Sequence, residues 1–166
     1  MNIKNIIIIG AGNVATHLAI TLQKAGYNIL QVFSRTEASA STLAIRLGCP
    51  YTTDIDKVSS EGQLYIVSVK DSALDSLLAP LTRRAPQALF VHTAGSVPMN
   101  IWQGQAQRYG VLYPMQTFSK QRPVDFHEVS FFTEANTQDD LKALNGIALS
   151  LGSKVYEASS EQRRYL

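Results

Sequence analysis

The sequence predicts an α/β fold in which a doubly wound, mostly parallel sheet carries helices on both faces. Strand and helix signals alternate along all 166 residues. The strand segments have no polar side, which is typical of parallel strands that are buried on both faces. The segments between them are long enough for the helical crossovers of βαβ units. The length fits a single domain with a full hydrophobic core.

The first strand and helix have the clearest signals. Ile6–Ile9 is a run of β-branched residues and predicts a buried strand. Val14, Leu18 and Leu22 then recur every four residues, which predicts an amphipathic helix over 13–25.

The later elements follow the same alternation. Further strands are expected at 29–33, 50–53, 64–69, 88–92, 110–113, around 131–132 and at 154–156. Further helices are expected at 36–47, from Asp71 to Pro80 or soon after, at 137–151, and from Ser159, where Ser159 and Gln162 have capping-box spacing. Glycines stand at three of the predicted helix ends, at Gly26, Gly48 and Gly152.

Composition excludes several classes of protein. Apolar residues make up 45% of the chain and charged residues 17%, which excludes intrinsic disorder. A net charge of +2, with basic doublets only at 83–84 and 163–164, is a poor footprint for a nucleic-acid-binding protein. Apolar runs such as Ile6–Ile9 are far shorter than the roughly 18 residues of a membrane span. We therefore expect a soluble, cytoplasmic protein with neither nucleic acid nor membrane as a partner.

A glycine-rich turn predicts a dinucleotide site of the Rossmann type. Gly10–Ala15 reads G-x-G-x-x-A and lies directly between the first strand and the first helix. In this motif Gly10 allows the tight turn, Gly12 lets the backbone approach a pyrophosphate, and Ala15 permits close packing of helix on strand. The helix N-terminus supplies free N–H groups for the phosphates. The cofactor-binding residues predicted here are Gly10, Ala11, Gly12, Asn13 and Val14. The alternative is a purely structural turn.

The end of the second strand favours NADP over NAD. A site for NAD normally has an acidic residue there, which accepts hydrogen bonds from the ribose 2′-hydroxyl. This chain has Ser34, Arg35 and Thr36 instead, and a guanidinium can bind a 2′-phosphate through two hydrogen bonds. Glu37 falls in the first turn of the next helix, where the helix dipole explains it. The alternative is a solvated arginine beside a helix cap.

Because the carboxyl ends of parallel strands share one edge, two later strand ends should line the same crevice, Ser68–Asp71 and His92–Ser96. The residues assigned to it as cofactor-binding are Val69, Lys70, His92, Thr93 and Ala94. His92 and Ser96 are the candidate catalytic residues, with His92 as a proton donor of near-neutral pKa. The alternative is a strand-end histidine bonded to a backbone carbonyl. Lys70 is expected to face solvent or phosphate.

Two further groups of residues carry weaker signals. The segment Tyr113–Ser119 is either a wall of the substrate pocket or a loop that packs on the core. His17, His127 and the single cysteine, Cys49, have no ligand spacing, so we predict no metal site and no internal disulfide.

With these motifs the chain resembles the N-terminal part of a family of Rossmann-like NADP oxidoreductases, related to pyrroline-5-carboxylate reductase and 6-phosphogluconate dehydrogenase. The matching segments are GAGNVATHLA, SRT, VSVKDSAL, HTAGS and YPMQTFS. The resemblance implies hydride transfer between NADP and a small substrate with a C=O or C=N bond. It also implies a cofactor domain at 1–158, with 159–166 as the start of an all-helical C-terminal domain that completes the pocket and forms a homodimer. The present chain alone is then expected to be inactive. The alternative is a non-catalytic NADP-binding sensor or regulatory module.

Overall fold

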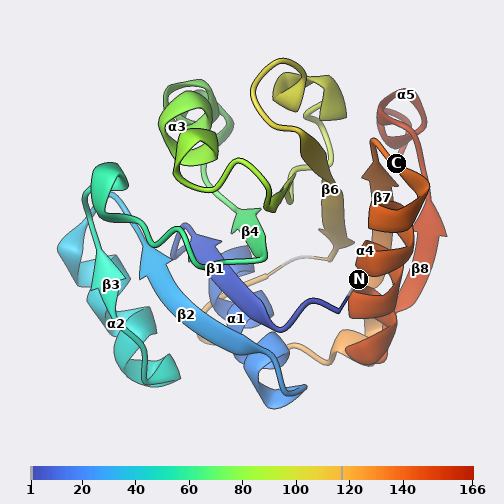
Figure 1. The fold of residues 1–166 in the computed structure, drawn as a ribbon. Coiled ribbons are helices and arrows are strands. Elements are labelled where there is room, and N and C mark those ends of the chain that lie inside the picture. The colour runs from blue at the N-terminus through green and yellow to red at the C-terminus, as the bar shows by residue number, and fades with distance from the viewer. Residues whose placement is uncertain (1, 117) are drawn as a thin grey trace.

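Eight strands form one sheet in the order β3-β2-β1-β4-β5-β6-β7-β8, with helices against both faces (Figure 1). The structure is a computed structural model that describes residues 2–116 and 118–166. The predicted α/β class, a doubly wound and mostly parallel sheet, is confirmed.

The helices and strands alternate in the expected order. The strands are β1 (Asn5–Ile9), β2 (Asn28–Phe33), β3 (Tyr51–Thr52), β4 (Leu64–Val67), β5 (Leu89–His92), β6 (Arg108–Met115), β7 (Ser130–Ala135) and β8 (Lys154–Glu157). The α-helices are α1 (Asn13–Lys24), α2 (Glu37–Leu47), α3 (Asp71–Arg84), α4 (Gln138–Ser150) and α5 (Ser160–Arg163). Short 3-10 helices are η1 (Ile55–Lys57), η2 (Met99–Trp102) and η3 (Phe126–Glu128).

The strand order creates a switch point beside β1. Strands β1 to β6 pair in parallel, β7 pairs antiparallel with β6, and β8 pairs in parallel with β7. From β1 the chain first builds the sheet outward to β3 and then returns to add β4 on the other side of β1. The connections at the carboxyl ends of β1 and β4 therefore diverge, which leaves the crevice where folds of this class bind ligands.

The sheet separates two hydrophobic cores. In β1, Ile6 and Ile8 belong to the core that contains apolar residues of α1, α2 and α4, whereas Ile7 and Ile9 belong to the core under α3 and η2. Figure 1 shows the same layers, with α3 above the sheet and α1 and α2 below it. All four isoleucines are fully buried, which explains why this strand has no polar side.

Helix α3 does not stop at Pro80, the first of its predicted ends, but continues for one more turn to Arg84. Leu81 and Thr82 are buried in the last turn, and the Thr82 hydroxyl donates to the carbonyl of Leu78 at 2.9 Å. Tertiary packing of this turn therefore outweighs the hydrogen bond that proline cannot make.

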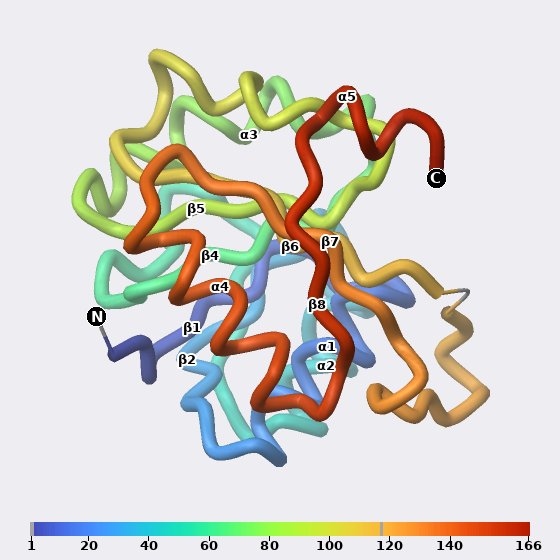
Figure 2. The backbone as a smooth tube through the Cα atoms, turned by 90° about the vertical axis from the view of Figure 1, so that its right-hand side faces the viewer, coloured from blue at the N-terminus to red at the C-terminus, as the bar shows by residue number. Residues whose placement is uncertain are grey.

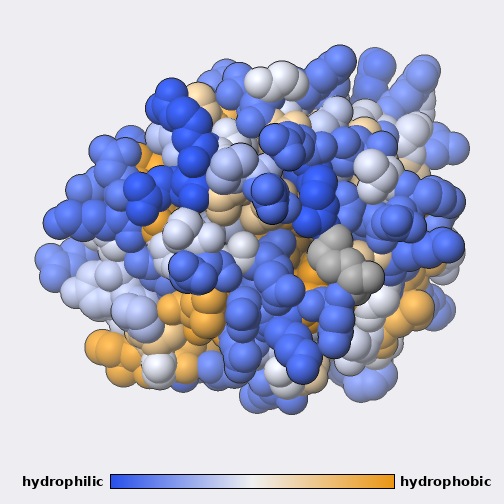
Figure 3. Space-filling model, viewed as in Figure 1, coloured by the Kyte–Doolittle hydropathy of each residue, from blue (hydrophilic) through white to orange (hydrophobic). Residues whose placement is uncertain are grey.

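In Figure 2, α4 and β8 form the side of the molecule that faces the viewer, and α5 lies far from the N-terminus. The face in Figure 3 is mostly hydrophilic, and its largest apolar area lies over α2, the helix that carries the exposed Ile45. Within residues 2–116 and 118–166, no helix has the length and hydropathy of a membrane span.

Candidate functional site

Gly10 is required by the fold itself. It follows β1 with a φ of +118°, a region that side chains of L-residues rarely adopt. A Cβ atom at this position would lie 2.1 Å from the carbonyl oxygen of Ser68, at the end of β4. The turn after β1 and the end of β4 can approach this closely only because residue 10 is glycine.

The fold does not require a glycine at position 12. Its φ of −80° and ψ of −161° are open to any residue, and a Cβ atom there would have nothing within 4 Å. Gly12 is the N-cap of α1, where no side chain caps the helix and no acidic residue lies in the first turn. The absent side chain thus leaves open space in front of the N–H groups at the positive end of the helix.

A pocket of about 400 Å³ lies beside this turn. It is bounded by the glycine turn and by the segments that follow β2 and β4, which meet at the switch point. Its lining residues are Gly10, Ala11, Gly12, Phe33, Ser34, Arg35, Thr36, Ser39, Ser68, Val69, Lys70 and Ala73. The structure therefore brings together eight of the predicted cofactor-binding residues: Gly10, Ala11, Gly12, Ser34, Arg35, Thr36, Val69 and Lys70.

Three lining residues were missed by the sequence analysis: Phe33, Ser39 and Ala73. Ser68 directly follows β4 and belongs to the strand end that was predicted to line the crevice. Ser39 lies in the first turn of α2, so its position in a predicted helix was the available signal. Phe33 and Ala73 are buried apolar residues whose sequence context indicates only core packing.

The pocket is positively charged. Arg35 and Lys70 are both exposed, and neither side chain has a hydrogen bond or ion pair to another residue of the described chain. None of the described residues that line the pocket is acidic. Glu37, close in sequence, accepts a hydrogen bond from the hydroxyl of Tyr51 at 3.1 Å, and this contact raises the pKa of the tyrosine. The site therefore suits an anion.

Asn13 and Val14 do not line this pocket. The side chain of Asn13 donates to the carbonyl of Phe118 at 3.1 Å, and Val14 packs against the core. His17, one turn further along α1, contacts the carbonyl of Ser119 through its Nε2 atom. Two polar side chains of α1 therefore hold the segment that follows β6.

Tyr113–Ser119 was predicted to be either a wall of the substrate pocket or a loop that packs on the core, and different residues of the segment fit each interpretation. Tyr113 lines a separate hollow, as a pocket wall would. Phe118 is buried against the rings of His17 and Phe126, as a core-packing loop would be. Thr117 lies outside the described residues.

His92, the last residue of β5, is fully buried. Its Nδ1 atom accepts a hydrogen bond from the backbone N–H of Ala94 at 3.1 Å, so Nε2 carries the proton and donates to the carbonyl of Pro98 at 3.3 Å. Burial lowers the pKa of His92 from 6.5 to about 4. The imidazole is therefore neutral near pH 7, and its one proton is donated to a backbone carbonyl, so this geometry speaks against the predicted proton-donor role.

The other predicted residues after β5 lie apart from the glycine-turn pocket. Thr93 is buried and Ala94 half-buried. Ser96 is exposed and lines a hollow of about 430 Å³ together with Gly95, Tyr113, Arg163, Arg164 and Leu166. Because β4 and β5 are parallel neighbours, both groups lie on the carboxyl side of the sheet.

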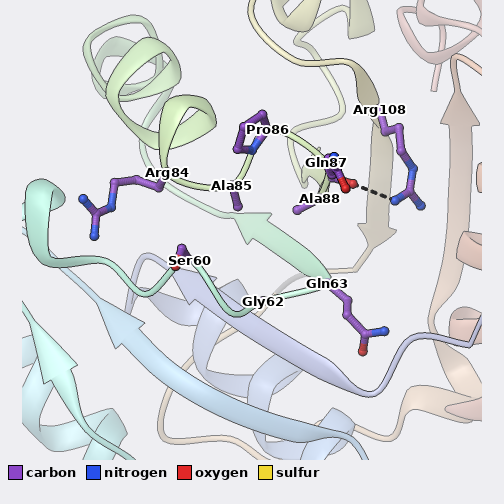
Figure 4. Close-up of a pocket in the computed structure, with 9 residues that line it drawn as sticks. All are labelled: Ser60, Gly62, Gln63, Arg84, Ala85, Pro86, Gln87, Ala88 and Arg108. Atoms are coloured by element: carbon purple, nitrogen blue, oxygen red, sulfur yellow. Dashed lines mark hydrogen bonds between the residues drawn. The ribbon is translucent and has the colours of Figure 1, made fainter.

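A larger pocket of about 500 Å³ lies at the amino ends of β4, β5 and β6 (Figure 4). Its arginines are engaged in structural contacts: Arg84 donates to the carbonyl of Val58 at 2.9 Å, and Arg108 pairs with Asp140 at 2.7 Å. Arg108 also donates to the carbonyl of Gln87, drawn as a dashed line in Figure 4. Since α/β sheets bind ligands at the carboxyl edge, this pocket is a weaker candidate than the smaller one beside Gly12.

Comparison with known proteins places the fold and the site in context. Residues 5–95 match the protein family described as "NADP oxidoreductase coenzyme F420-dependent". A Bacteroides fragilis protein provisionally assigned as an NADP oxidoreductase is 52% identical, with a TM-score of 0.95 over 98% of this chain. A search of curated proteins found no match.

Two more distant structures share the fold. Prephenate dehydrogenase of Aquifex aeolicus, solved with hydroxyphenyl propionate and NAD⁺, is 18% identical with a TM-score of 0.82 over 99% of this chain. Pyrroline-5-carboxylate reductase of Coxiella burnetii is 21% identical with a TM-score of 0.79 over 98%. The chain spans 63% of the Bacteroides and Aquifex proteins and 62% of the Coxiella protein.

Proposed function

The chain belongs to the family described as "NADP oxidoreductase coenzyme F420-dependent". We propose that it binds NADP in the pocket beside Gly12 and is the cofactor-binding part of an NADP-dependent oxidoreductase. The substrate class we propose is a small molecule with a C=O or C=N bond. The strong similarity to the Bacteroides protein supports an oxidoreductase, and the pocket supports the cofactor.

The single observation that carries the proposal is the open space at Gly12. The backbone conformation of Gly12 does not require glycine, and no protein atom occupies the space where a side chain would lie. A pyrophosphate needs this space, because its oxygens accept hydrogen bonds from the first N–H groups of α1. Asn13 and Val14 take part through their backbone N–H groups, since their side chains point elsewhere.

The preference for NADP over NAD rests on Arg35. Its exposed guanidinium lies on the pocket with Ser34 and Thr36, at the strand end where a carboxylate would favour NAD. Thr36 is the N-cap of α2 but makes no capping hydrogen bond, which leaves its hydroxyl available. Two hydroxyls and one cation suit a 2′-phosphate.

The other residues of the carboxyl edge orient the far end of the cofactor. Val69 and Lys70 extend the pocket from the glycine turn toward β5, and Thr93, Ala94 and Ser96 continue the edge. We place the nicotinamide end along this loop, where Ser96 offers a hydroxyl to a substrate. Bound NADPH supplies a hydride, and the protein holds it in place and shields it from water.

We take residues 1–158 as the cofactor-binding unit and 159–166 as the start of a helical domain that completes the substrate pocket and the homodimer. The longer relatives support this division, because the chain spans less than two thirds of their length. A non-catalytic NADP sensor remains the competing function, and it would use the same pocket.

Titration of the protein with NADPH and with NADH in a calorimeter tests the cofactor. We expect saturable binding, tighter for NADPH, and no binding of either would refute the proposal. Catalysis is tested by NADPH consumption with a panel of small ketones and cyclic imines, using a chain as long as the Bacteroides relative. Turnover of any member supports the oxidoreductase, whereas cofactor binding without turnover across the panel supports the sensor.

A further inference from the structure

Arg163, in α5, is a buried cation whose whole donor set is used. Its side chain is 0% exposed and pairs with Glu134 of β7 at 2.7 Å. The same guanidinium donates to the carbonyls of Gly95 at 3.3 Å and Val97 at 2.7 Å, in the loop after β5. Longer contacts reach the carbonyl of Ala158 and the hydroxyl of Ser160.

The side chains of His92, Arg163 and Ser160 hold the backbone of this loop at several positions. His92 accepts from the N–H of Ala94 and donates to the carbonyl of Pro98. Arg163 binds the carbonyls of Gly95 and Val97, which lie between these positions, and the hydroxyl of Ser160 accepts from the N–H of Met99 at 2.9 Å. Residues 94–99 are thus held from the sheet by a histidine and from α5 by an arginine and a serine.

A further contact to the loop comes from Tyr113 of β6. A Cβ atom on Gly95 would be 2.6 Å from the ring of Tyr113, so the tyrosine packs directly against the loop backbone. Glu134 completes the arrangement, because it also accepts from the N–H of Ser160 at 3.3 Å and from its hydroxyl at 2.9 Å.

Stability alone is a weak reason for this arrangement. The cost of burying two charges often equals or exceeds their attraction, and apolar replacements are frequently as stable. The guanidinium instead fixes the geometry of the loop, because its planar set of donors binds two carbonyls of the loop at once. That loop is the part of the carboxyl edge where we placed the nicotinamide end.

We propose that Arg163, with Glu134 and Ser160, is a positioning residue that holds loop 94–98 in the form that receives the nicotinamide half of NADP. This inference rests on the function proposed above. Arg163 contacts the loop and acts through it. The adenosine half, held by Gly12 and Arg35, should not depend on Arg163, because none of the residues in this network lines that pocket.

The test compares two ligands that differ in the nicotinamide half. NADPH contacts the whole site, whereas adenosine 2′,5′-bisphosphate carries only the half that binds near Arg35. In Arg163→Gln we expect NADPH affinity to fall about tenfold, which is the loss if the competent loop form drops to roughly a tenth of the population. Affinity for the bisphosphate should stay unchanged. Arg163→Lys should restore part of the NADPH affinity, because it keeps the charge but not the fork of donors.

Arg46→Gln is the matched control, since Arg46 is an exposed arginine in the last turn of α2 that lines neither the pocket beside Gly12 nor the hollow beside Ser96, and it should leave both affinities unchanged. If Arg163→Gln does not fold, Ser160→Ala carries the test, because it removes the contact to Met99 without stranding a buried charge. Equal weakening of both ligands, or of neither, would overturn the positioning role. Absence of binding of either ligand to the parent protein would instead overturn the proposed function.

Discussion

At the scale of single residues, Gly10 and Gly12 lie in one turn but answer to different constraints. The turn needs Gly10 for its positive φ and for the approach of Ser68, whereas the space at Gly12 is empty of protein atoms. Substitutions at these two positions should therefore separate folding from binding.

Gly12→Val should abolish most NADPH binding while the fold survives. Valine reaches the extended conformation of residue 12 without strain and meets no neighbour, so the free energy of unfolding should fall by only about 1 kcal/mol, the cost of a poor N-cap. Gly10→Ala should instead cost about 2 kcal/mol or more, because its methyl group overlaps a carbonyl oxygen. Urea unfolding and calorimetry of both variants measure the two effects. Unchanged NADPH affinity in Gly12→Val would remove the pyrophosphate from this turn.

Arg35→Ala should remove most of the discrimination between NADPH and NADH. A charge-assisted hydrogen bond contributes about 1.5–3 kcal/mol, so NADPH affinity should drop roughly ten- to a hundredfold while NADH affinity barely changes. Since Arg35 is exposed, added salt should also shrink the preference of the parent protein. Arg46→Ala, an exposed arginine in the last turn of α2, is the control. A ratio of affinities that survives in Arg35→Ala would assign the preference to another residue.

The lowered pKa of the buried His92 predicts that the protein loses stability in acid. Because its folded pKa of about 4 lies below the ordinary 6.5, the unfolded chain binds more protons between these values. Stability should therefore fall as pH falls through this window, by about 3 kcal/mol in total from this one group. His92→Gln should be less stable at neutral pH but lose less between pH 7 and 4, as measured by urea unfolding at each pH. Parallel pH curves for the two proteins would contradict a buried neutral histidine.

At the scale of elements, the sequence was informative wherever a pattern was local. The isoleucine run, the four-residue spacing in α1 and the Ser159–Gln162 capping box all specify structure within a few residues, and both hydrogen bonds of that box are present. Gly26, Gly48 and Gly152 have positive φ at or just after helix ends, as predicted. The pocket beside Gly12 was predictable for the same reason, because its residues follow predicted strands.

Contacts between distant segments were beyond the sequence. Asp140 lies in the first turn of α4, where the helix dipole favours an acidic residue, yet its buried carboxylate pairs with Arg108 of β6. The role proposed for Arg163 depends on contacts with Gly95 and Val97, more than sixty residues away in the sequence, and no local sequence pattern predicts these contacts. For His92, the alternative of a strand-end histidine bonded to a backbone carbonyl matches the contact with Pro98, but neither its complete burial nor which carbonyl it binds can be read from a strand end.

Pro80 offers a prediction at this scale. It lies inside α3, where it leaves one backbone carbonyl without its helical partner, and packing of the last turn compensates. Pro80→Ala should raise the free energy of unfolding by about 1–2 kcal/mol, less than the roughly 3 kcal/mol penalty of proline in a helix, because proline also restricts the unfolded chain. Urea unfolding decides the sign. A loss of stability would mean that the proline ring itself is needed for packing.

At the scale of the whole molecule, the pocket joins three strands that are distant in sequence. Its lining comes from the segments after β1, β2 and β4, so a ligand that fills it binds only when the central sheet is assembled. Binding to the folded state alone makes stability depend on ligand concentration.

NADPH should therefore protect the entire fold against heat. At about one hundred times its dissociation constant, it should add about 2.7 kcal/mol to the free energy of unfolding. For a domain of this size each kcal/mol is worth roughly 2–4 °C in Tm, so the expected rise is about 5–10 °C. NADH at the same concentration should give a smaller rise, and Gly12→Val should give almost none with either cofactor. Thermal unfolding followed by circular dichroism measures all three cases. An equal rise in Gly12→Val would mean that NADPH stabilises the protein from a different site, and the open space at the N-terminus of α1 would then need another ligand.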